Sequence, residues 1–367
     1  MQQKRIIISG GGTGGHIFPA LAIAGELKNR FPGADILFVG AKGKMEMEKV
    51  PAAGYKIIGL PVMGLPRKPG LKMFKFLAML FKSNREARRI IREFQPHIAV
   101  GVGGFASGPL LQAATRKNIP TLIQEQNSYA GITNKILGKK ADKICVAYEN
   151  MANYFSSDKI IFTGNPVREG LLNQNPGRQA AAGYFGFNAD DKIILIIGGS
   201  LGARSINNAI LKNINLIGES GVKVIWQTGS FYFDEMVRKT SENKPENLQI
   251  HKFINRMELA YGAADVIVSR AGAGTISELC IAGKPVVLIP SPNVAEDHQT
   301  RNAMALAKKN AAIIIKDEEI DRNLFITILE LVNYEVRLNQ LSENIKKLAK
   351  PDATKRIVDE IEKMARW

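Results

Sequence analysis

The stretch Arg5-Ile6-Ile7-Ile8-Ser9-Gly10-Gly11-Gly12-Thr13-Gly14-Gly15-His16 joins a short apolar run to a loop that contains five glycines. The same arrangement returns half a chain later, where residues 192–197 lead into Gly198-Gly199-Ser200-Leu201-Gly202-Ala203. Each apolar run predicts a buried parallel strand, and helical patterns follow over residues 18–30 and 205–217. Glycines at such a junction let the backbone approach a ligand, and a helix N-terminus favours negative charge. The repeated unit therefore predicts two α/β domains with a phosphorylated ligand between them.

Strands and helices alternate along the rest of the chain, which is typical of doubly wound parallel sheets. A long amphipathic pattern closes the chain from about residue 343, and the polar stretch 174–182 predicts a surface connection. We expect an N-terminal domain over residues 1–163, a C-terminal domain over 164–344 and a last helix over about 345–367. Further helices are predicted at residues 45–53, 83–94 and 106–116, and further strands at 36–39, 56–59, 97–102, 121–124, 143–146, 159–162, 223–228, 248–252, 266–269, 285–289 and 311–315.

The composition is that of a soluble globular protein. The chain has 367 residues, of which 45% are hydrophobic and 23% charged, a length that suits two domains. Its two cysteines, Cys145 and Cys280, fit a reducing compartment and argue against a disulfide scaffold. Because the N-terminus runs directly into a strand, we expect no signal peptide, and no stretch reaches the roughly 18–20 apolar residues of a spanning helix.

The first glycine loop matches the G-x-G-x-x-G pattern at Gly10, Gly12 and Gly15. A nicotinamide site also needs a carboxylate at the end of the second strand, and none is present over residues 38–42. His16 follows the loop, where strand ends converge, and histidine as a residue type suits removal of a proton from a hydroxyl. A purely structural histidine is the alternative. We predict catalysis or substrate contact for His16.

Two more polar or glycine-rich turns follow strands in the first half of the chain. Residues 101–109, Gly-Val-Gly-Gly-Phe-Ala-Ser-Gly-Pro, predict a second phosphate cradle or, as the alternative, a close-packed turn. Residues 124–131, Gln-Glu-Gln-Asn-Ser-Tyr-Ala-Gly, predict hydrogen bonding to a polyhydroxylated ligand or a solvated loop.

The second half carries two comparable clusters. In the run 269–278, Thr275 or Ser277 can cap a helix, and Glu278 in its first turn either caps it or accepts both hydroxyls of a ribose. Gln299 and Asn302 are spaced i, i+3 and share a helix face, where amides can read sugar hydroxyls. The sequence contains no Asp-x-Asp motif. We therefore expect no metal site of that kind, and expect diphosphate charge to meet helix N-termini, backbone amides and Arg168.

Positive charge is concentrated near the N-terminus. The net charge is +16, and residues 1–100 hold 17 lysines and arginines against six acidic residues. Residues 63–92 place cations around a bulky apolar stretch, which predicts an interfacial membrane element rather than a nucleic-acid site. A core helix with solvated lysines is the alternative. The predicted membrane residues are Leu71, Phe74, Leu77 and Phe81, with Lys72, Lys75 and Lys82.

These motifs, in this order and at these spacings, resemble the MurG family of bacterial peptidoglycan N-acetylglucosaminyltransferases. The resemblance runs from residue 5 to the end of the chain. It rests on the runs 11–16, 103–109, 125–127, 164–168, 198–203 and 269–278 and on the pair Gln299 and Asn302.

The resemblance implies a GT-B fold, with two Rossmann-like domains facing a deep cleft and a last helix that packs back on the first domain. It implies transfer of N-acetylglucosamine from UDP-GlcNAc to the 4-hydroxyl of undecaprenyl-pyrophosphoryl-MurNAc-pentapeptide, with inversion. The enzyme would be peripheral, at the anionic cytoplasmic face of the cell membrane, with no tightly bound cofactor and no nucleic-acid partner.

The resemblance also implies a role for each matching position. Ile254 would meet the uracil through its backbone, and Glu278 would bind the ribose. Ser200 and Arg168 would meet the diphosphate, and His16 is the candidate base. The sugar would be held by Gln299, Asn302 and the backbone of Ala273, Gly274, Thr275, Ile276 and Ser277. Thr13, Gly14, Gly15 and Asn127 would reach the donor from the first domain, and Gly103, Gly104, Ser107 and Gly108 would take the acceptor diphosphate.

Three other functions compete with this interpretation. A transferase of the same fold could act on a diacylglycerol or sterol acceptor, which needs no diphosphate cradle. A two-domain epimerase could use the same nucleotide sugar, but would have no use for the basic apolar strip. A non-catalytic scaffold would bind no donor.

Overall fold

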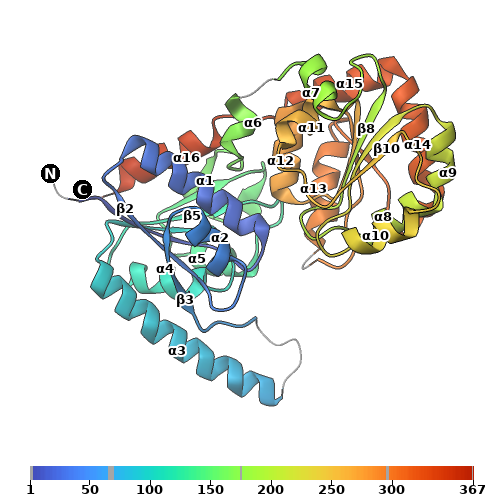
Figure 1. Ribbon diagram of the computed structural model, residues 1–367. Helices are drawn as coiled ribbons and strands as arrows, with labels where there is room; N and C mark the ends of the chain where they lie inside the picture. The colour runs from blue at the N-terminus through green and yellow to red at the C-terminus, as the bar shows by residue number, and fades with distance from the viewer. Residues whose placement is uncertain (1–2, 65–69, 174–175, 295–296, 366) are drawn as a thin grey trace. The chain divides into compact units, whose positions relative to one another are not determined.

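The computed structural model describes residues 3–64, 70–173, 176–294, 297–365 and 367. The chain folds into two compact units. The first contains the chain up to Arg168 together with Lys350–Trp367, and the second contains Glu169–Ala349. Each unit is a parallel β-sheet with helices on both faces (Figure 1). The prediction of two α/β domains built on parallel sheets is therefore confirmed.

The sheet of the first unit has seven strands in the order β3-β2-β1-β4-β5-β6-β7. Chain order reverses between β1 and β4, and ligands of open α/β sheets bind beside the carboxyl ends of the strands at such a switch point. Both strands end there in glycine-rich turns. The strands are β1 (Arg5–Ser9), β2 (Asp35–Ala41), β3 (Lys56–Leu60), β4 (Ile98–Gly101), β5 (Thr121–Glu125), β6 (Lys143–Val146) and β7 (Ile160–Phe162).

Two helical layers enclose this sheet because its strands are apolar on both faces. On one face pack α1 (Gly14–Arg30), α2 (Glu46–Ala52) and α16 (Ala353–Met364), and α16 lies along α1 (Figure 1). On the other pack α3 (Leu71–Phe94), α4 (Ser107–Thr115) and α5 (Ile132–Gly138). Two short 3₁₀ turns, Met151–Asn153 and Ser157–Lys159, precede β7.

The second unit repeats the plan with six parallel strands in the order β10-β9-β8-β11-β12-β13. The strands are β8 (Ile193–Ile197), β9 (Lys223–Gln227), β10 (Leu248–His251), β11 (Val266–Ser269), β12 (Val286–Leu288) and β13 (Ile313–Ile314). The helices are α6 (Glu169–Asn173), α7 (Arg178–Tyr184), α8 (Arg204–Lys212), α9 (Ile214–Glu219), α10 (Phe233–Thr240), α11 (Met257–Ala263), α12 (Ala273–Ala282), α13 (His298–Ala307), α14 (Ile320–Asn333) and α15 (Glu335–Lys346), with a 3₁₀ turn at Asp317–Glu319.

Several predicted helices have different limits. The last helix is not continuous: α15 ends at Lys346 and α16 begins at Ala353, because Pro351 lies between them and cannot continue a helix. The helix predicted over 205–217 is divided into α8 and α9 at Asn213. The helix predicted from residue 18 begins at Gly14, since glycines of low helix propensity hide its first turn from a sequence pattern.

The prediction of a surface connection over residues 174–182 is wrong for its second half. Residues 174 and 175 lie outside the described residues, but α7 begins at Arg178. The Arg178 guanidinium holds this short helix by bonding the Ala189 carbonyl at 3.0 Å and the Asp265 carboxylate at 2.9 Å. Such tertiary contacts are invisible to a periodicity argument.

Both cysteines are free and buried, one in each unit. Burial raises the pKa of the Cys145 thiol and of the Cys280 thiol to about 12. Each therefore packs as a small apolar side chain.

Candidate functional site

The two glycine turns of the first unit interlock. Gly103 and Gly104 have φ values of +96° and +90°, which side chains rarely adopt. A Cβ on Gly104 would lie 2.4 Å from the Gly11 carbonyl oxygen, and a Cβ on Gly103 would lie 2.8 Å from the His16 ring. The turns after β1 and β4 are thus packed backbone against backbone at the switch point.

Ser107 ties these two turns together. It is fully buried, and its hydroxyl lies 2.9 Å from both the Ser9 and the Gly103 carbonyl oxygens. Gly104 and Gly108, which flank it, are half-buried. Among the four residues predicted to take the acceptor diphosphate, the hydroxyl of Ser107 is therefore engaged in shaping the turn.

His16 lies in the first turn of α1. Its Nδ1 is 3.0 Å from the Gly11 carbonyl oxygen and 3.3 Å from the Thr13 hydroxyl. Thr13 is exposed and adopts extended backbone geometry, with its carbonyl accepting from the amides of His16 and Ile17. Thr13, Gly14, Gly15 and His16 therefore form one helix entry beside the Gly103 turn.

Glu46, shortly after the end of the second strand, is a buried carboxylate that no sequence motif indicated. This residue begins α2, is fully buried, and accepts hydrogen bonds from the backbone N–H of Gly12 at 3.1 and 3.0 Å and of Ala41 at 2.8 Å. The sequence does place an acidic residue shortly after β2. It lies five residues beyond the end of the strand, however, whereas a ribose-binding carboxylate stands at the strand end itself. The Glu46 carboxylate is directed at the glycine loop.

The polar cluster after β5 is mostly internal. The Glu125 carboxylate accepts from the Asn127 backbone N–H at 3.0 Å and from the Asn134 amide at 2.8 Å. The Gln124 amide donates to Asn165 at 2.9 Å, and Asn165 donates to the Gln126 carbonyl at 3.0 Å. This network joins the run 125–127 to the run 164–168 and leaves Asn127 half-buried at the surface.

Arg168 follows that network and is exposed. Its guanidinium carbon lies 5.9 Å from the ring centroid of Phe18, at the outer limit of a cation–π contact. Phe18 belongs to α1, two residues after His16. The structure thus brings the two predicted catalytic residues, His16 and Arg168, to the same end of α1.

The second glycine loop has its own interlocking partner. Gly202 has a φ of +91°, and a Cβ there would lie 2.0 Å from the Thr228 carbonyl oxygen. Gly229 has a φ of +85°, and a Cβ there would lie 2.1 Å from the Gly202 nitrogen. Ser200 is exposed at the tip of the loop, where its carbonyl accepts from the Ser230 backbone N–H at 3.1 Å.

Gln227, the last residue of β9, was not singled out from the sequence. Its amide donates to the Gly199 carbonyl at 3.2 Å, and its carbonyl oxygen accepts from the Ile254 backbone N–H at 2.9 Å. The Gln227 side chain thereby connects the glycine loop to Ile254, the residue predicted to meet the uracil. The backbone N–H of Ile254 is engaged in this contact.

Glu278 does not cap its helix. Helix α12 begins at Ala273, so Glu278 lies in the second turn, and the cap interpretation of Thr275, Ser277 and Glu278 is wrong. The Ser277 hydroxyl donates to the Ala273 carbonyl at 3.1 Å, and the Glu278 carboxylate accepts from the Tyr261 hydroxyl at 3.2 Å. Gly274 and Thr275 are half-buried, and Ala273 and Ile276 are buried.

Gln299 and Asn302, the predicted pair on α13, make different contacts. The carbonyl oxygen of Gln299 accepts from the Ser291 backbone N–H at 2.9 Å, and Gln299 is half-buried. Asn302 is fully buried, with its amide 3.5 Å from the Ala271 carbonyl oxygen. Asn302 therefore contacts the loop that precedes α12.

Arg270 lies inside the motif 269–278 but received no role from the sequence. Its guanidinium bonds the Asp317 carboxylate at 2.5 Å, the Ser205 hydroxyl at 2.6 Å and the Ile289 carbonyl at 3.1 Å. It ties the ends of β11 and β12 to the start of α8. Three predicted site segments of the second unit come after β8, β11 and β12, which are neighbours in the sheet. Because these strands are parallel, the segments lie at the same, carboxyl-terminal edge of the sheet.

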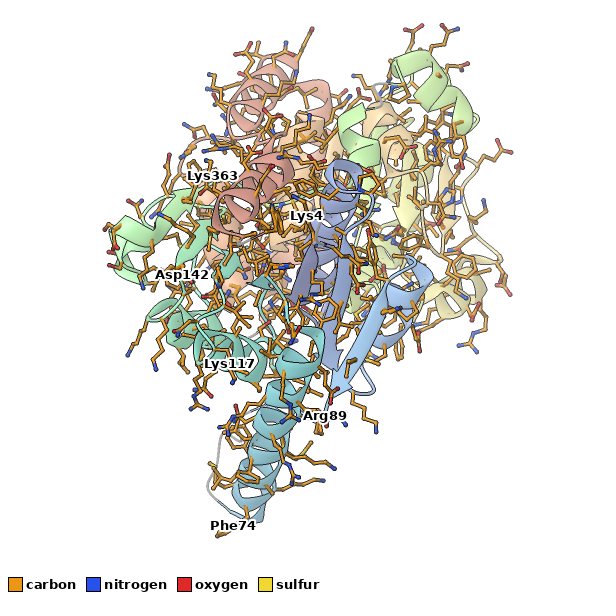
Figure 2. All side chains as sticks on the ribbon, turned by 90° about the vertical axis from the view of Figure 1, so that its left-hand side faces the viewer. Lys4, Phe74, Arg89, Lys117, Asp142 and Lys363 are labelled. Atoms are coloured by element: carbon orange, nitrogen blue, oxygen red, sulfur yellow. The ribbon has the colours of Figure 1, made fainter. Side chains whose placement is uncertain are left out.

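The basic apolar stretch over residues 71–82 forms the first half of one 24-residue helix, α3. Its second half packs Ala87, Ile90 and Ile91 into the core, whereas Phe74 and Phe81 are each 73% exposed. Figure 2 shows Phe74 at the projecting end of this helix. Lys75 and Lys82 are exposed, Leu77 and Leu80 are partly so, and the side chains of Leu71 and Lys72 are not among those described.

Exposure of both phenylalanines means that this half of α3 is not a core helix. Arg67 and Lys68, which also belong to the basic segment, lie outside the described residues. In the described part of the chain, no helix has the length and apolar character needed to cross a membrane.

Comparisons with known proteins agree with this architecture. Residues 6–146 match the glycosyltransferase family 28 N-terminal domain, and residues 193–357 match the glycosyltransferase family 28 C-terminal domain. A protein of Parabacteroides distasonis is 55% identical, with 99% of each chain covered, and one of Phocaeicola vulgatus is 56% identical, with 99% of this chain and 97% of that protein covered. Both are named UDP-N-acetylglucosamine--N-acetylmuramyl-(pentapeptide) pyrophosphoryl-undecaprenol N-acetylglucosamine transferase.

Among solved structures, MurG of Acinetobacter baumannii superimposes with a TM-score of 0.77 at 30% identity, covering 98% of this chain and 99% of that one. Family models and full-length relatives therefore agree. The chain belongs to glycosyltransferase family 28 and, within it, to the family of the UDP-N-acetylglucosamine--N-acetylmuramyl-(pentapeptide) pyrophosphoryl-undecaprenol N-acetylglucosamine transferases.

Proposed function

We infer that this protein transfers N-acetylglucosamine from UDP-GlcNAc to the 4-hydroxyl of undecaprenyl-pyrophosphoryl-MurNAc-pentapeptide, the step from lipid I to lipid II in peptidoglycan synthesis. The observation that carries this function is identity of 55–56% over nearly the full length of relatives that bear the name of this transferase. The protein is a hexosyltransferase, and UDP-GlcNAc is its donor substrate.

In the reaction, the acceptor oxygen bonds to the anomeric carbon while the bond from that carbon to the diphosphate breaks. The electron pair leaves with the diphosphate, and the configuration at the anomeric carbon inverts. We propose that His16 takes the proton of the acceptor hydroxyl and that Arg168 stabilises the charge on the leaving diphosphate. Their placement at the same end of α1 supports these roles.

Most of the proposed donor-binding residues belong to the second unit. Ser200 meets the diphosphate, Glu278 binds the ribose, and the backbone of residues 273–277 contacts the sugar. Gln299 holds the sugar, and buried Asn302 acts by fixing the loop before α12. Ile254 contacts the uracil. In the first unit, the proposed donor-binding residues are Thr13, Gly14, Gly15 and Asn127, and the proposed acceptor-binding residues are Gly103, Gly104, Ser107 and Gly108.

A transfer assay tests the function. Labelled N-acetylglucosamine is supplied as UDP-GlcNAc to a lipid-linked muramoyl-pentapeptide, with a diacylglycerol acceptor in parallel. We expect label only in the muramoyl product. Label in the diacylglycerol alone would keep the fold and donor but overturn the acceptor, and no label in either would contradict the transferase assignment.

Replacing Glu278 by alanine is expected to weaken UDP-GlcNAc binding about ten- to hundredfold, because hydrogen bonds to a charged group are worth about 1.5–3 kcal/mol. Titration calorimetry with the donor measures the change. Glu219→Ala, at an exposed site on α9 in the same unit, is the matched control and should bind as the parent does. An unchanged donor affinity in Glu278→Ala removes the ribose assignment.

We also propose that the protein is peripheral at the cytoplasmic face of the cell membrane, docked through the first half of α3. Exposed aromatic and aliphatic groups there lie next to the exposed lysines Lys75 and Lys82, and the exposed Arg85 follows on the same helix, as in interfacial helices that bind anionic lipid. The projecting position of Phe74 supports this orientation (Figure 2).

Changing Phe74, Leu77 and Phe81 together to serine is expected to lower binding to anionic vesicles at least tenfold, since burial of each such side chain contributes about 1.5–3 kcal/mol. Co-sedimentation with phosphatidylglycerol vesicles measures it.

The matched control is a triple serine variant at Leu216, Ile326 and Val336, which are 49%, 61% and 70% exposed in the second unit. That control should sediment like the parent. Equal binding by the α3 variant and the parent would show that the membrane is met elsewhere.

A further inference from the structure

One buried carboxylate organises the first glycine loop. Glu46 is fully buried, and its oxygens accept the Gly12 N–H at 3.1 and 3.0 Å and the Ala41 N–H at 2.8 Å. Hydrogen bonds to an ionised acceptor are roughly twice as strong as neutral ones. In a typical dinucleotide-binding loop, such N–H groups face a phosphate. Here the Gly12 N–H faces a side chain of the same chain.

Two glycines from different segments make room for this carboxylate. A Cβ on Gly11 would lie 2.1 Å from Glu46 Oε1, and a Cβ on Gly40 would lie 2.5 Å from Glu46 Cγ. Both distances are far below van der Waals contact. The glycine loop and the end of β2 are thus shaped around Glu46.

The Gly12 N–H and the Gly11 carbonyl belong to one peptide group. Glu46 accepts from its N–H, and its carbonyl oxygen lies 3.0 Å from His16 Nδ1. A carboxylate, a peptide and an imidazole therefore form one hydrogen-bonded chain. Members of such a chain polarise one another, so the carboxylate makes the Gly11 carbonyl a stronger acceptor.

We propose that Glu46 is a positioning residue for the transfer reaction, which acts through the Gly11–Gly12 peptide to keep the proton of neutral His16 on Nδ1. A carbonyl oxygen can only accept, so Nδ1 must be the protonated nitrogen where it faces Gly11. The Thr13 hydroxyl, 3.3 Å from Nδ1, can accept or donate and does not oppose this tautomer. The lone pair then lies on Nε2.

The consequence for the reaction rests on the role of His16 proposed above. The proton of the acceptor hydroxyl moves to Nε2 as the acceptor oxygen bonds to the anomeric carbon and the electron pair leaves with the diphosphate. The ring becomes an imidazolium that still donates from Nδ1 to Gly11. The negative charge of Glu46, one peptide away, offsets the new positive charge.

The first measurement is the tautomer of neutral His16 in the parent protein, which needs no activity assay. Nitrogen-15 spectra of histidine-labelled protein distinguish protonated from unprotonated ring nitrogens, and His16→Asn identifies the His16 signals among the four histidines. We expect neutral His16 to carry its proton on Nδ1. A proton on Nε2 overturns the proposal, whether or not the protein transfers sugar.

The second measurement uses Glu46→Gln, which keeps the shape of the side chain and removes its charge. We expect kcat to fall about ten- to hundredfold, the size of loss seen for hydrogen-bond partners of metal-binding histidines, with the KM for the donor within a few-fold. The His16 signals should move toward a mixture of tautomers. Glu46→Asp, which restores the charge, should recover part of kcat and of the Nδ1–H signal.

Glu48→Gln is the matched control, because Glu48 is exposed on the same helix. It should leave both kcat and the His16 spectrum unchanged. A folded Glu46→Gln protein with parental kcat and tautomer overturns the proposal. If Glu46→Gln does not fold, the spectrum of the parent decides, and absence of transfer by the parent contradicts only the proposed function.

Discussion

Gly202→Ala is expected to destabilise the second unit by about 2–5 kcal/mol. An alanine at a φ of +91° costs about 1–2 kcal/mol, and its methyl group would lie 2.0 Å from the Thr228 carbonyl oxygen, where overpacking adds about 1–3 kcal/mol. The methyl group cannot be accommodated by rotation of a side chain, because the obstacle is backbone. Loss of the loop geometry should also weaken donor binding.

Tryptophan fluorescence during thermal unfolding measures the effect. The chain has two tryptophans, so Trp367→Phe leaves Trp226 as the reporter of the second unit. Trp226 is fully buried and donates to Asn207, whose amide donates to the Thr228 carbonyl beside Gly202. We expect the midpoint to fall by about 10 °C.

Gly199→Ala is the matched control in the same loop. Gly199 has a φ of +86°, but a Cβ there would meet no atom within 4 Å. Its cost should be limited to the backbone term of about 1–2 kcal/mol. Equal midpoints for the two variants would show that the loop moves away from β9 to accommodate a methyl group, contrary to a rigid interlocked pair.

Arg168→Ala is expected to lower kcat about 10²–10³-fold while the affinity for UDP-GlcNAc changes by no more than a few-fold. Removing one group aimed at developing transition-state charge has an effect of this size, and the charge on the diphosphate grows only as the bond to the sugar breaks. Initial rates at varied donor concentration, with donor binding measured separately, distinguish the two quantities.

Arg116→Ala changes an exposed arginine elsewhere in the first unit and should leave kcat intact. Arg168→Lys tests geometry, since lysine keeps the charge but loses the planar fork, and should recover only part of the rate. An equal fall in kcat and in donor affinity for Arg168→Ala would assign Arg168 to ground-state binding instead.

The sequence determined the architecture because burial on both faces of a parallel sheet needs runs of isoleucine, leucine and valine that a reader can recognise. Runs such as residues 5–9 and 192–197 became the central strands β1 and β8, with their glycine turns at the carboxyl edge. The order and spacing of the motifs also indicated the family.

The ends of helices were harder to predict from the sequence, since they depend on local contacts that override helix propensity. Gly14 and Gly15 are poor helix formers, yet they open α1 because Thr13 accepts from the amides that follow. Arg178 holds a helix in a polar stretch through partners that are up to 87 residues away.

Only the tertiary structure decided which polar residues are buried in hydrogen bonds that hold the glycine loops and turns in place. Ser107 and Asn302 match ligand-binding motifs but are fully buried against backbone carbonyls, whereas Glu46 and Gln227 match no motif and yet hold both glycine loops. The reason is physical: a strand or a glycine turn is encoded by neighbours in sequence, but the partner of a buried carboxylate or amide is chosen by which backbone N–H or carbonyl the fold brings within 3 Å.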